Sequence, residues 1–429
     1  MRYPLKDGYF ITDDTREVDA NTYFLQTAQN SRYIENLDKN TKIIYPEELY
    51  KEWGLESIGV VGITGTNGKT TTAAIIYSLL TDLGYICGLQ GTRGFFLNDQ
   101  RIESKSLTTP SILQTLYNIY RTKQGGGEYF VMEVSSHAID QNRIESINFA
   151  LKVFTNVTQD HLDYHHSIAE YRAVKSRFFS DETLKLINKD EAKKIVFNEH
   201  KAYTYSLDEP STFKIEAFSL HGGIKAVINH LGQMATFESS LVGVFNVYNL
   251  AAAIASVKLI TNESLERICQ MVSNFGGVSG RMEVVSYNPL VIVDFAHTPD
   301  GMLKVLESIK DRDIAVVFGA GGDRDRDKRP KMGLVASKFA KKIYITSDNP
   351  RSEDPKEIIE DIAKPLVGKE GIYKIVDRKE AIVQAIKDLK EDEVLLILGK
   401  GDEDYIEIAG KKYPFDDREV AREALELLS

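Results

Sequence analysis

The segment with the clearest chemistry is a glycine-rich stretch that ends in lysine and threonine, residues 64–72. It follows the apolar run 58–63 and precedes a helical pattern of apolar residues. A strand, a glycine-rich turn, a Lys-Thr pair and a helix form a phosphate-binding loop, in which backbone N–H groups and Lys69 hold phosphates while the Thr70 hydroxyl binds Mg²⁺. Ile63 stands where the usual pattern has glycine. The segment predicts the use of ATP or GTP, but not the reaction.

Polar side chains follow two further predicted strands. Glu133 lies near the end of the apolar run 129–134, and a carboxylate at such a place often holds a nucleotide-bound Mg²⁺. Taken alone, Glu133 is as readily a solvated carboxylate at the end of a strand. The next run, 149–154, leads into 155–166, which holds three of the eight histidines within six residues. That grouping favours a polar site.

Lys175 belongs to a predicted helix over residues 171–179. It lies at spacings of three and four from Tyr171, Phe178 and Phe179, so it shares their face of the helix. Spacing alone favours a lysine whose stem packs on apolar neighbours while its ammonium reaches water.

Three more polar or glycine-rich turns lie towards the C-terminus, at residues 280–283, 294–300 and 318–325. The second and third follow apolar runs that predict strands. The third is a lone glycine-rich turn with charges, which is a weak sign of a site, and a solvated loop is its plainer interpretation.

The composition limits the function classes. The net charge of −10 speaks against general nucleic-acid binding, so anionic substrates must meet local basic clusters. The first ten residues lack the apolar stretch of a signal peptide, and no run approaches about 18 apolar residues, so we expect no membrane segment. Cys87 and Cys269 form no metal pattern and fit a reducing cytoplasm.

The 429 residues predict an α/β chain of three domains. We expect a short N-terminal α/β domain over 1–57, a central P-loop ATPase-like domain with a largely parallel sheet over 58–285, and a Rossmann-like C-terminal domain over 286–429. Residues 203–238 look β-rich and irregular, as in a local insertion. The strands expected in the last domain are 291–294, 314–319, 343–346 and 394–399.

Taken together, these segments resemble those of the Mur ligases in kind and in order. The likeness covers about residues 58–429 and is greatest to the MurE type, which adds the third residue of the peptidoglycan stem peptide. The phosphate-binding loop begins early, so the N-terminal domain is abbreviated, although 13–16 resembles the family's opening motif. The matching segments are 64–72, 133–137, 156–165, 171–179, 243–249, 280–283, 294–300, 319–330 and 348–351.

The resemblance implies an ATP-dependent, ADP-forming amide ligase. ATP would phosphorylate the free side-chain carboxylate of D-Glu in UDP-MurNAc-L-Ala-D-Glu, and the amine of meso-diaminopimelate would attack the acyl phosphate. Two anions must approach in line, so charge neutralisation and positioning would dominate. The partners would be these small molecules, with no nucleic acid and no membrane segment, and the chain would be a monomer.

The resemblance also implies roles at the nucleotide. Lys69 would act on the β- and γ-phosphates, Thr70 and Glu133 would bind one Mg²⁺, and His161 the second. Lys175 matches a carbamylated lysine, whose CO2-derived carbamate gives the second Mg²⁺ an oxygen ligand; this overturns the interpretation from spacing. The other positions implied to bind ATP are Thr64, Gly65, Thr66, Asn67, Gly68, Thr71, Asn246, Asn249, Arg281, Asp294 and His297.

The amino-acid choice would rest on the segment 348–351. Diaminopimelate carries a distal carboxylate that L-lysine lacks, and Arg351 would hold it with a bidentate contact. Glu403 would take the distal ammonium. Asp402 stands where the family usually has histidine, and Ala320 where it often has cysteine. The diaminopimelate contacts are implied at Arg324, Asp348, Asn349, Arg351, Gly399 and Glu403, and the UDP-MurNAc-peptide contacts at Thr15, Thr108, Thr109, Ser135, Gln141 and Arg143.

Two alternatives stay open. One is another ligase of the superfamily, either the L-lysine-adding enzyme or folylpolyglutamate synthase; Arg351 argues against lysine, and the motif at 13–16 against folate. The other is a P-loop switch or transport ATPase, which would need neither the segment 133–137 nor Lys175. Vigorous ATP turnover without both co-substrates would favour the switch.

Overall fold

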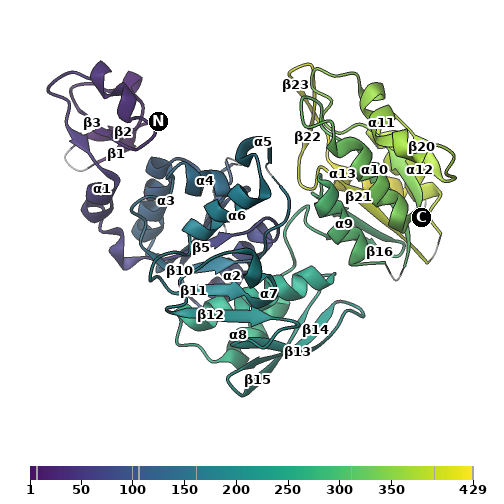
Figure 1. The fold of residues 1–429 in the computed structure, drawn as a ribbon, viewed down its shortest axis with the longest axis horizontal. Coiled ribbons are helices and arrows are strands. Elements are labelled where there is room, and N and C mark those ends of the chain that lie inside the picture. The colour runs from purple at the N-terminus through teal and green to yellow at the C-terminus, as the bar shows by residue number, and fades with distance from the viewer. Residues whose placement is uncertain are drawn as a thin grey trace. The chain divides into compact units, whose positions relative to one another are not determined.

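The chain folds into two compact units (Figure 1). One consists of Met1–Ser219, Lys225–Ser239 and Val247–Phe275, and the other of Leu220–Ile224, Ser240–Asn246 and Gly276–Ser429. Within the part of the chain that the structure describes, no helix is long and apolar enough to cross a membrane. The predicted three-domain boundaries at residues 57 and 285 stay predictions. The computed structural model describes residues 1–5, 8–98, 100–104, 107–160, 162–310, 312–390 and 392–427.

The N-terminal segment forms a small four-stranded sheet whose strands follow one another in sequence order. Ile11, Phe24 and Leu25 are fully buried there. The ring of Tyr3 stacks on that of Tyr117 at 4.1 Å between centroids. The elements are β1 (Tyr3–Pro4), β2 (Phe10–Thr12), β3 (Thr22–Leu25), β4 (Ile43–Ile44), α1 (Pro46–Glu52) and the 3₁₀ helices η2 (Thr15–Glu17), η3 (Ser31–Asn36) and η4 (Leu55–Ser57).

The first unit is built on an eleven-stranded sheet with the order β15-β14-β13-β12-β11-β10-β5-β9-β6-β7-β8. β5 (Gly59–Thr64) lies between β10 (Phe149–Phe154) and β9 (Tyr129–Glu133) and runs parallel to both. Their near-continuous apolar runs suit strands that are buried on both faces, and the predicted central parallel sheet is confirmed. The other strands are β6 (Cys87–Gly91), β7 (Gly94–Leu97), β8 (Gln100–Glu103), β11 (Lys185–Asn188), β12 (Ala202–Ser206), β13 (Phe213–Ser219), β14 (Ile224–His230) and β15 (Gln233–Ser239).

The segment 203–238 is β-rich as predicted, but the prediction of an irregular insertion is wrong. β12 pairs in parallel with β11, and β13 pairs in parallel with β12 and antiparallel with β14. The segment therefore completes one side of the central sheet. Its alternation of buried and exposed residues, as in β15, is that of strands with one face towards water.

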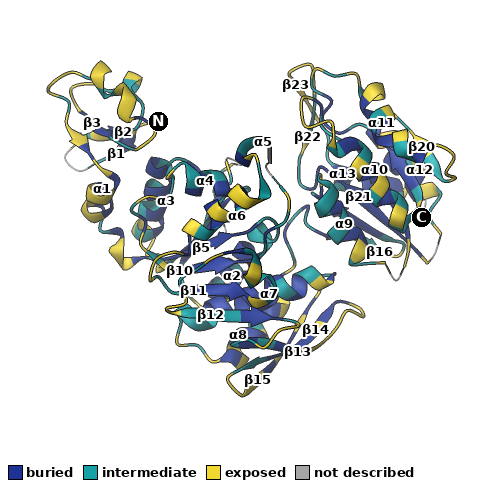
Figure 2. Cartoon of the chain, viewed as in Figure 1, coloured by how far each residue is buried: buried dark blue, intermediate teal, exposed yellow. Residues whose placement is uncertain are grey.

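One helix of this unit ends where the sequence predicts, just before the glycine at position 84, which favours a helix stop after the phosphate-binding loop. α2 (Lys69–Asp82) starts after Gly68, whose φ is +86°, and is followed by Gly84 at φ +96°. Its apolar residues are buried against the sheet, and Figure 2 shows buried strands with exposed residues gathered on helix surfaces and loops. The others are α3 (Ile112–Gln124), α4 (Ser136–Asp140), α5 (Leu162–His165), α6 (Ile168–Arg177), α7 (Val244–Ile260), α8 (Leu265–Met271), η5 (Lys189–Lys194) and η6 (Val272–Asn274).

The second unit has a six-stranded sheet with the order β16-β17-β21-β18-β19-β20. Every neighbouring pair is parallel except β16 with β17. This confirms the predicted Rossmann-like strand series. The strands are β16 (Glu283–Tyr287), β17 (Leu290–Asp294), β18 (Asp313–Phe318), β19 (Ala340–Ile345), β20 (Ile372–Lys374) and β21 (Glu393–Leu398), and β22 (Tyr405–Ile408) and β23 (Lys411–Pro414) form a separate hairpin.

Helices cover both faces of this second sheet. Residues of α9, α10 and α11 form one apolar core with the sheet, and residues of α12 and α13 form another. The loops after β17, β18, β19 and β21 lie at the carboxyl ends of parallel strands, where α/β folds place their ligands. The helices are α9 (Pro299–Glu307), α10 (Lys328–Phe339), α11 (Pro355–Ala363), η7 (Lys364–Leu366), α12 (Arg378–Lys387) and α13 (Asp417–Glu426).

Candidate active site

The phosphate-binding loop joins β5 to α2 as predicted. Gly68 precedes the first helical residue at a positive φ, and a Cβ there would lie 2.5 Å from Asn249 Oδ1. Lys69 Nζ donates to the carbonyl oxygens of Gly65 at 2.8 Å and Thr66 at 2.9 Å. The lysine therefore lies over its own loop, with its ammonium at the N-terminus of the helix, where anions are favoured.

The end of β10 supports this loop from the side. Asn67 N donates to Asn156 Oδ1 at 3.0 Å, and the Thr155 hydroxyl donates to Asn67 O at 2.7 Å. The Thr66 hydroxyl lies 3.1 Å from the Tyr171 hydroxyl on α6. Two segments distant in sequence, the end of β10 and α6, thus support the loop. Thr71 lies in the first turn of α2.

Thr70 and Glu133 lie together, as predicted for a metal site. The Thr70 hydroxyl donates to Glu133 Oε2 at 2.8 Å, and Glu133 is 2% exposed. Thr92, after β6, was missed by sequence reasoning; its N–H donates to Glu133 Oε1 at 2.9 Å. The glycine that precedes Thr92 could have pointed to it, because a Cβ at Gly91 would lie 2.1 Å from Glu133 Oε1.

A hydroxyl and a carboxylate are oxygen ligands that suit Mg²⁺. The described residues contain no group of three or more His, Cys, Asp and Glu side chains that could hold a metal. The pair Thr70–Glu133 supplies two such oxygens, and Mg²⁺ in nucleotide sites takes most of its other ligands from phosphate and water.

Lys175 is buried, and the interpretation from spacing that its ammonium reaches water is wrong. The residue is 1% exposed, and its Nζ lies 3.4 Å from Thr64 Oγ1 and 4.7 Å from the centre of the Tyr171 ring. Burial sets the pKa of Lys175 well below its usual value, the charge of Lys69 lowers it further, and Asp160 opposes the shift. The side chain thus lies at the end of β5, beside the phosphate-binding loop.

The histidine group is divided. His161, predicted to bind the second Mg²⁺, lies outside the described residues. His165 is 4% exposed, and its Nε2 lies 2.9 Å from the Ser136 hydroxyl. Its ring also packs 5.2 Å from that of Tyr171, so it helps to hold α6 against α4.

Five of the six residues predicted for the UDP-MurNAc-peptide form one connected set beside Glu133. The Thr108 hydroxyl lies 3.1 Å from that of Thr92. Thr109 Oγ1 donates to Glu133 O at 2.9 Å and accepts from Ser135 N at 3.0 Å. Arg143 Nη1 donates to Thr109 O at 3.0 Å, and its Nη2 donates to Gln141 Oε1.

Burial lowers the pKa of Arg143, although the group keeps its charge. Thr15, the sixth predicted contact, lies in η2 beside Asp14, whose side chain caps that helix. Gln29, which sequence reasoning missed, donates to Gln141 O at 3.1 Å and thereby joins the N-terminal sheet to the set.

Three residues predicted to bind the nucleotide, Arg281, Asp294 and His297, lie near the start of the C-terminal sheet. Asp294 is 7% exposed, and its carboxylate accepts from Met282 N at 2.8 Å and Ala296 N at 2.7 Å. Burial raises its pKa. The guanidinium of Arg281 lies 4.3 Å from the centre of the Phe295 ring, and His297 is exposed.

Asn246 lies in the first turn of α7, where its Nδ2 donates to Val242 O at 2.8 Å. Asn249, one turn later, accepts from the Thr72 hydroxyl at 3.3 Å. Asn249 therefore lies at the phosphate-binding helix, and its contact with the nucleotide stays a prediction.

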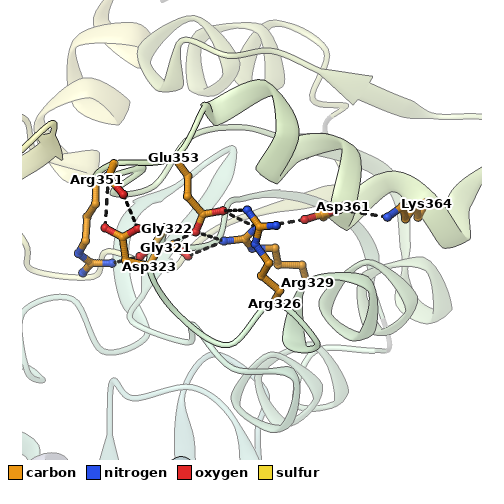
Figure 3. A network of polar contacts seen from close by, with 10 residues as sticks. Gly321, Gly322, Asp323, Arg326, Arg329, Arg351, Glu353, Asp361 and Lys364 are labelled. Carbon is orange, nitrogen blue, oxygen red and sulfur yellow. Dashed lines mark hydrogen bonds and ion pairs between the residues drawn. The ribbon is translucent and has the colours of Figure 1, made fainter.

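Arg351 lies in the loop after β19, in the left-handed backbone region at φ +52°. Its Nη1 donates to Gly322 O at 2.6 Å (Figure 3). Its Nε lies 3.4 Å from Glu407 Oε2. A Cβ at Gly321 would lie 2.9 Å from Arg351 Nη1 and 3.6 Å from Arg324 Cγ. The two arginines predicted to bind diaminopimelate thus lie beside the same glycine turn.

A polar network holds this turn against the Arg351 loop (Figure 3). Arg329, 1% exposed, makes a two-point contact with Glu353 at 2.8 and 3.0 Å and reaches Asp361 at 3.1 Å. Arg326 also pairs with Glu353, and Asp323 N donates to it at 2.6 Å. Hydrogen bonds from Arg329 and then Arg326 lower the pKa of Glu353 to about 2.

Asn349 and Glu403 lie together on loops after β19 and β21. Asn349 Nδ2 donates to Glu403 Oε2 at 2.9 Å. Gly399 has φ +115°, and a Cβ there would lie 2.7 Å from Oδ2 of Asp348, which is 8% exposed. Lys400 is fully buried between these groups. The predicted diaminopimelate residues are thus brought together, and Lys400 is the residue that sequence reasoning passed over.

Arg378 was also missed, because nothing near it in sequence marks it. It is 2% exposed, makes a two-point contact at 2.7 Å with Asp417, and donates to Ser347 O and Leu398 O. It therefore holds the bases of both pocket loops.

The fold and these sites define an ATP-dependent ligase in which one sheet carries a phosphate-binding loop and another a cluster of charged side chains. Residues 63–257 match the family model described as the Mur ligase middle domain, and residues 280–401 match that described as the Mur ligase, glutamate ligase domain. The chain belongs to the Mur ligase family.

Two similar curated proteins share one name. The UDP-N-acetylmuramoyl-L-alanyl-D-glutamate–2,6-diaminopimelate ligase of Wolinella succinogenes is 53% identical, over 97% of this chain and 96% of its own. The ligase of the same name from Helicobacter hepaticus is 48% identical over the same shares. A solved structure of a ligase of that name superposes with a TM-score of 0.71 at 29% identity, over 97% of this chain and 94% of that chain.

Folylpolyglutamate synthase of Mycobacterium tuberculosis, solved with ADP, is similar with a TM-score of 0.66 at 17% identity, over 82% of this chain and 91% of that one. Identity at this level shows a shared fold alone. The likeness to folylpolyglutamate synthase therefore reflects the shared fold and does not support the folate alternative.

Proposed function

We propose that this chain joins meso-diaminopimelate to the D-Glu side-chain carboxylate of UDP-MurNAc-L-Ala-D-Glu, with ATP cleaved to ADP and phosphate. The observation that carries the proposal is that the second unit places a cation, Arg351, and a carboxylate, Glu403, on loops after β19 and β21 that contact each other through Asn349. Such a pocket suits an amino-acid end with both a carboxylate and an ammonium. The names of the relatives support the same reaction and do not favour the alternatives.

Activation of the carboxylate falls to the first unit. Lys69 and the loop N–H groups bind the phosphates, and Thr70 with Glu133 would hold Mg²⁺, which supplies positive charge to the transferring phosphoryl group. Arg143 would hold the acidic substrate through charge-assisted hydrogen bonds. The substrate carboxylate attacks the γ-phosphate, ADP leaves, and the amine of diaminopimelate then displaces phosphate from the acyl phosphate.

Lys175 would act as a carbamate. Only a neutral amine adds to CO2, and the burial of Lys175 favours the neutral form. The addition releases one proton and leaves an anionic group, which could hold a second Mg²⁺ that a lysine ammonium would repel. His161, outside the described residues, stays the predicted second ligand of that ion.

The proposed domains are the three predicted ones, 1–57, 58–285 and 286–429. We also propose that the enzyme is a cytoplasmic monomer. The two cysteines are buried and free, as suits a reducing compartment. Light scattering tests the monomer, whose mass would be 48.3 kDa.

ADP release by the purified chain tests the reaction. We expect release only when ATP, Mg²⁺, UDP-MurNAc-L-Ala-D-Glu and meso-diaminopimelate are all present, with L-lysine a poor replacement. Equal use of L-lysine would overturn the amino-acid assignment. Full ATP turnover without either co-substrate would overturn the ligase and favour a switch ATPase.

A further inference from the structure

Lys400 is a buried cation within the amino-acid pocket. It is 0% exposed and lies between Gly399 and Gly401 in the loop after β21. Its Nζ donates to Glu403 Oε2 at 3.1 Å and to Asn349 Oδ1 at 3.2 Å. A cation without water must be paired, and these two oxygens pair it.

The contacts of Lys400 orient both neighbours. Asn349 Oδ1 also accepts from Glu407 N at 2.9 Å, so its amide nitrogen must face Glu403. Glu403 Oε2 receives both Lys400 and Asn349. Within the described residues Glu403 Oε1 has no hydrogen bond, and the side chain is 23% exposed, so this oxygen remains available to a ligand.

The pairing also sets the charge that a ligand meets. Lys400 and Glu403 together are formally neutral, and Arg351 adds a cation whose nearest carboxylate, on Glu407, is 3.4 Å away. The far end of diaminopimelate is a zwitterion, whereas that of L-lysine is a bare ammonium. A bare ammonium gains little from a carboxylate that a buried lysine already neutralises, and it is repelled by both cations.

We propose that Lys400 determines amino-acid specificity: its buried ammonium neutralises Glu403 and fixes Asn349, so that the pocket accepts a zwitterionic end and disfavours a bare ammonium. This inference rests on the proposed ligase reaction. It adds to the carboxylate clamp of Arg351 a second element that acts against the competing substrate.

The variant Lys400→Met tests it, because methionine keeps much of the stem and removes the charge. We expect the KM for diaminopimelate to rise, with KM for ATP unchanged, and the ratio of kcat/KM for diaminopimelate over L-lysine to fall roughly tenfold, the loss of one hydrogen bond to a charged group. In the double variant Lys400→Met with Glu403→Gln, any increase in L-lysine use caused by Lys400→Met should disappear. That increase depends on the carboxylate of Glu403, which Lys400 no longer neutralises.

A merely structural role would lower both amino-acid activities together, and parallel losses would overturn the proposal. If Lys400→Met fails to fold, the wild-type enzyme still tests it with L-2-aminopimelate, which has the distal carboxylate but no distal ammonium. We expect it to be used better than L-lysine; better use of L-lysine would contradict the inference. A wild-type enzyme that uses no diaminopimelate would instead refute the proposed function itself.

Discussion

The phosphate-binding loop and the amino-acid pocket differ in how the chain builds them. The loop is one continuous segment between β5 and α2, whose glycine and lysine act through neighbouring backbone. The pocket combines loops after β18, β19 and β21, which meet through both backbone and side-chain contacts, such as Gly322 N with Asn349 O and Asn349 Nδ2 with Glu403 Oε2. A short motif therefore specifies the first site, whereas packing assembles the second.

Each region contains a buried lysine, and the two differ in their partners. Lys175 has a threonine hydroxyl at 3.4 Å and the charge of Lys69 nearby, so burial favours its neutral form. Lys400 has a carboxylate oxygen at 3.1 Å. Burial by itself thus does not decide what a lysine does: an amine whose partner is a hydroxyl is suited to chemistry, and an ammonium whose partner is a carboxylate is suited to setting charge.

The largest effect is expected at Lys175. Lys175→Ala should lower kcat more than about 100-fold, because the second Mg²⁺ loses a ligand. ADP release measured over a range of Mg²⁺ concentrations checks this. The matched control is Lys185→Met, a buried lysine whose Nζ donates to the carbonyls of Asp181 and His200; it should change stability without changing Mg²⁺ dependence. Wild-type activity in Lys175→Ala would exclude the carbamate.

Arg351→Ala should raise the KM for diaminopimelate roughly 100-fold, the loss of a two-point contact to a carboxylate, with KM for ATP nearly unchanged. Initial rates with each substrate varied in turn measure this. Arg351→Lys should recover part of the loss, because it keeps the charge but not the fork. An unchanged KM for diaminopimelate would contradict the role of Arg351 in binding the distal carboxylate.

Two glycine variants compare the regions directly. Gly68→Ala puts a Cβ 2.5 Å from Asn249 Oδ1 at φ +86°, and Gly399→Ala puts one 2.7 Å from Asp348 Oδ2 at φ +115°. Each should cost about 1 kcal/mol or more in strain. We expect Gly68→Ala to raise the KM for ATP about tenfold, and Gly399→Ala to raise the KM for diaminopimelate about tenfold. Crossed effects would mean that the two regions do not act separately.

The smallest kinetic effect is expected at Glu353, which holds the Arg351 loop without touching substrate. Glu353→Gln should raise the KM for diaminopimelate a few-fold at most. The wild-type pKa lies near 2, below the ordinary value of 4.5, so the stabilisation is present at neutral pH and is lost as pH falls from about 4.5 towards 2. The difference in unfolding free energy should be at most about 3 kcal/mol at pH 7.

Denaturant unfolding at pH 7 and pH 3 measures that difference, which should shrink at the lower pH. Glu360→Gln is the matched control on the same side of the sheet, since Glu360 and Lys374 form an exposed pair worth less than about 1 kcal/mol. A loss in Glu353→Gln that does not depend on pH would contradict the ion-pair explanation.

Much of the fold could be predicted, because parallel strands buried on both faces are near-continuous apolar runs. Helix ends were equally clear at Gly84. The segment 203–238 was correctly predicted to be β-rich, but its place in the central sheet was not predicted. That place depends on pairing with β11, a strand that precedes the segment in sequence. The motif residues Thr70 and Glu133 came together as expected, whereas Thr92 was found only from its contact with Glu133.

The sequence by itself determined the phosphate-binding loop, the order of the strands along the chain and the family. These depend on local backbone requirements, such as a glycine before a helix, and on apolar periodicity, which neighbouring residues define. Only the tertiary structure decided what the buried charges do. The sequence indicated a role for Lys175 only through the family resemblance and none for Lys400 or Arg378. Their partners in the structure are Thr64, Glu403 with Asn349, and Asp417. The charge and role of a buried group follow from the solvent it loses and the partners it gains, and both are products of packing.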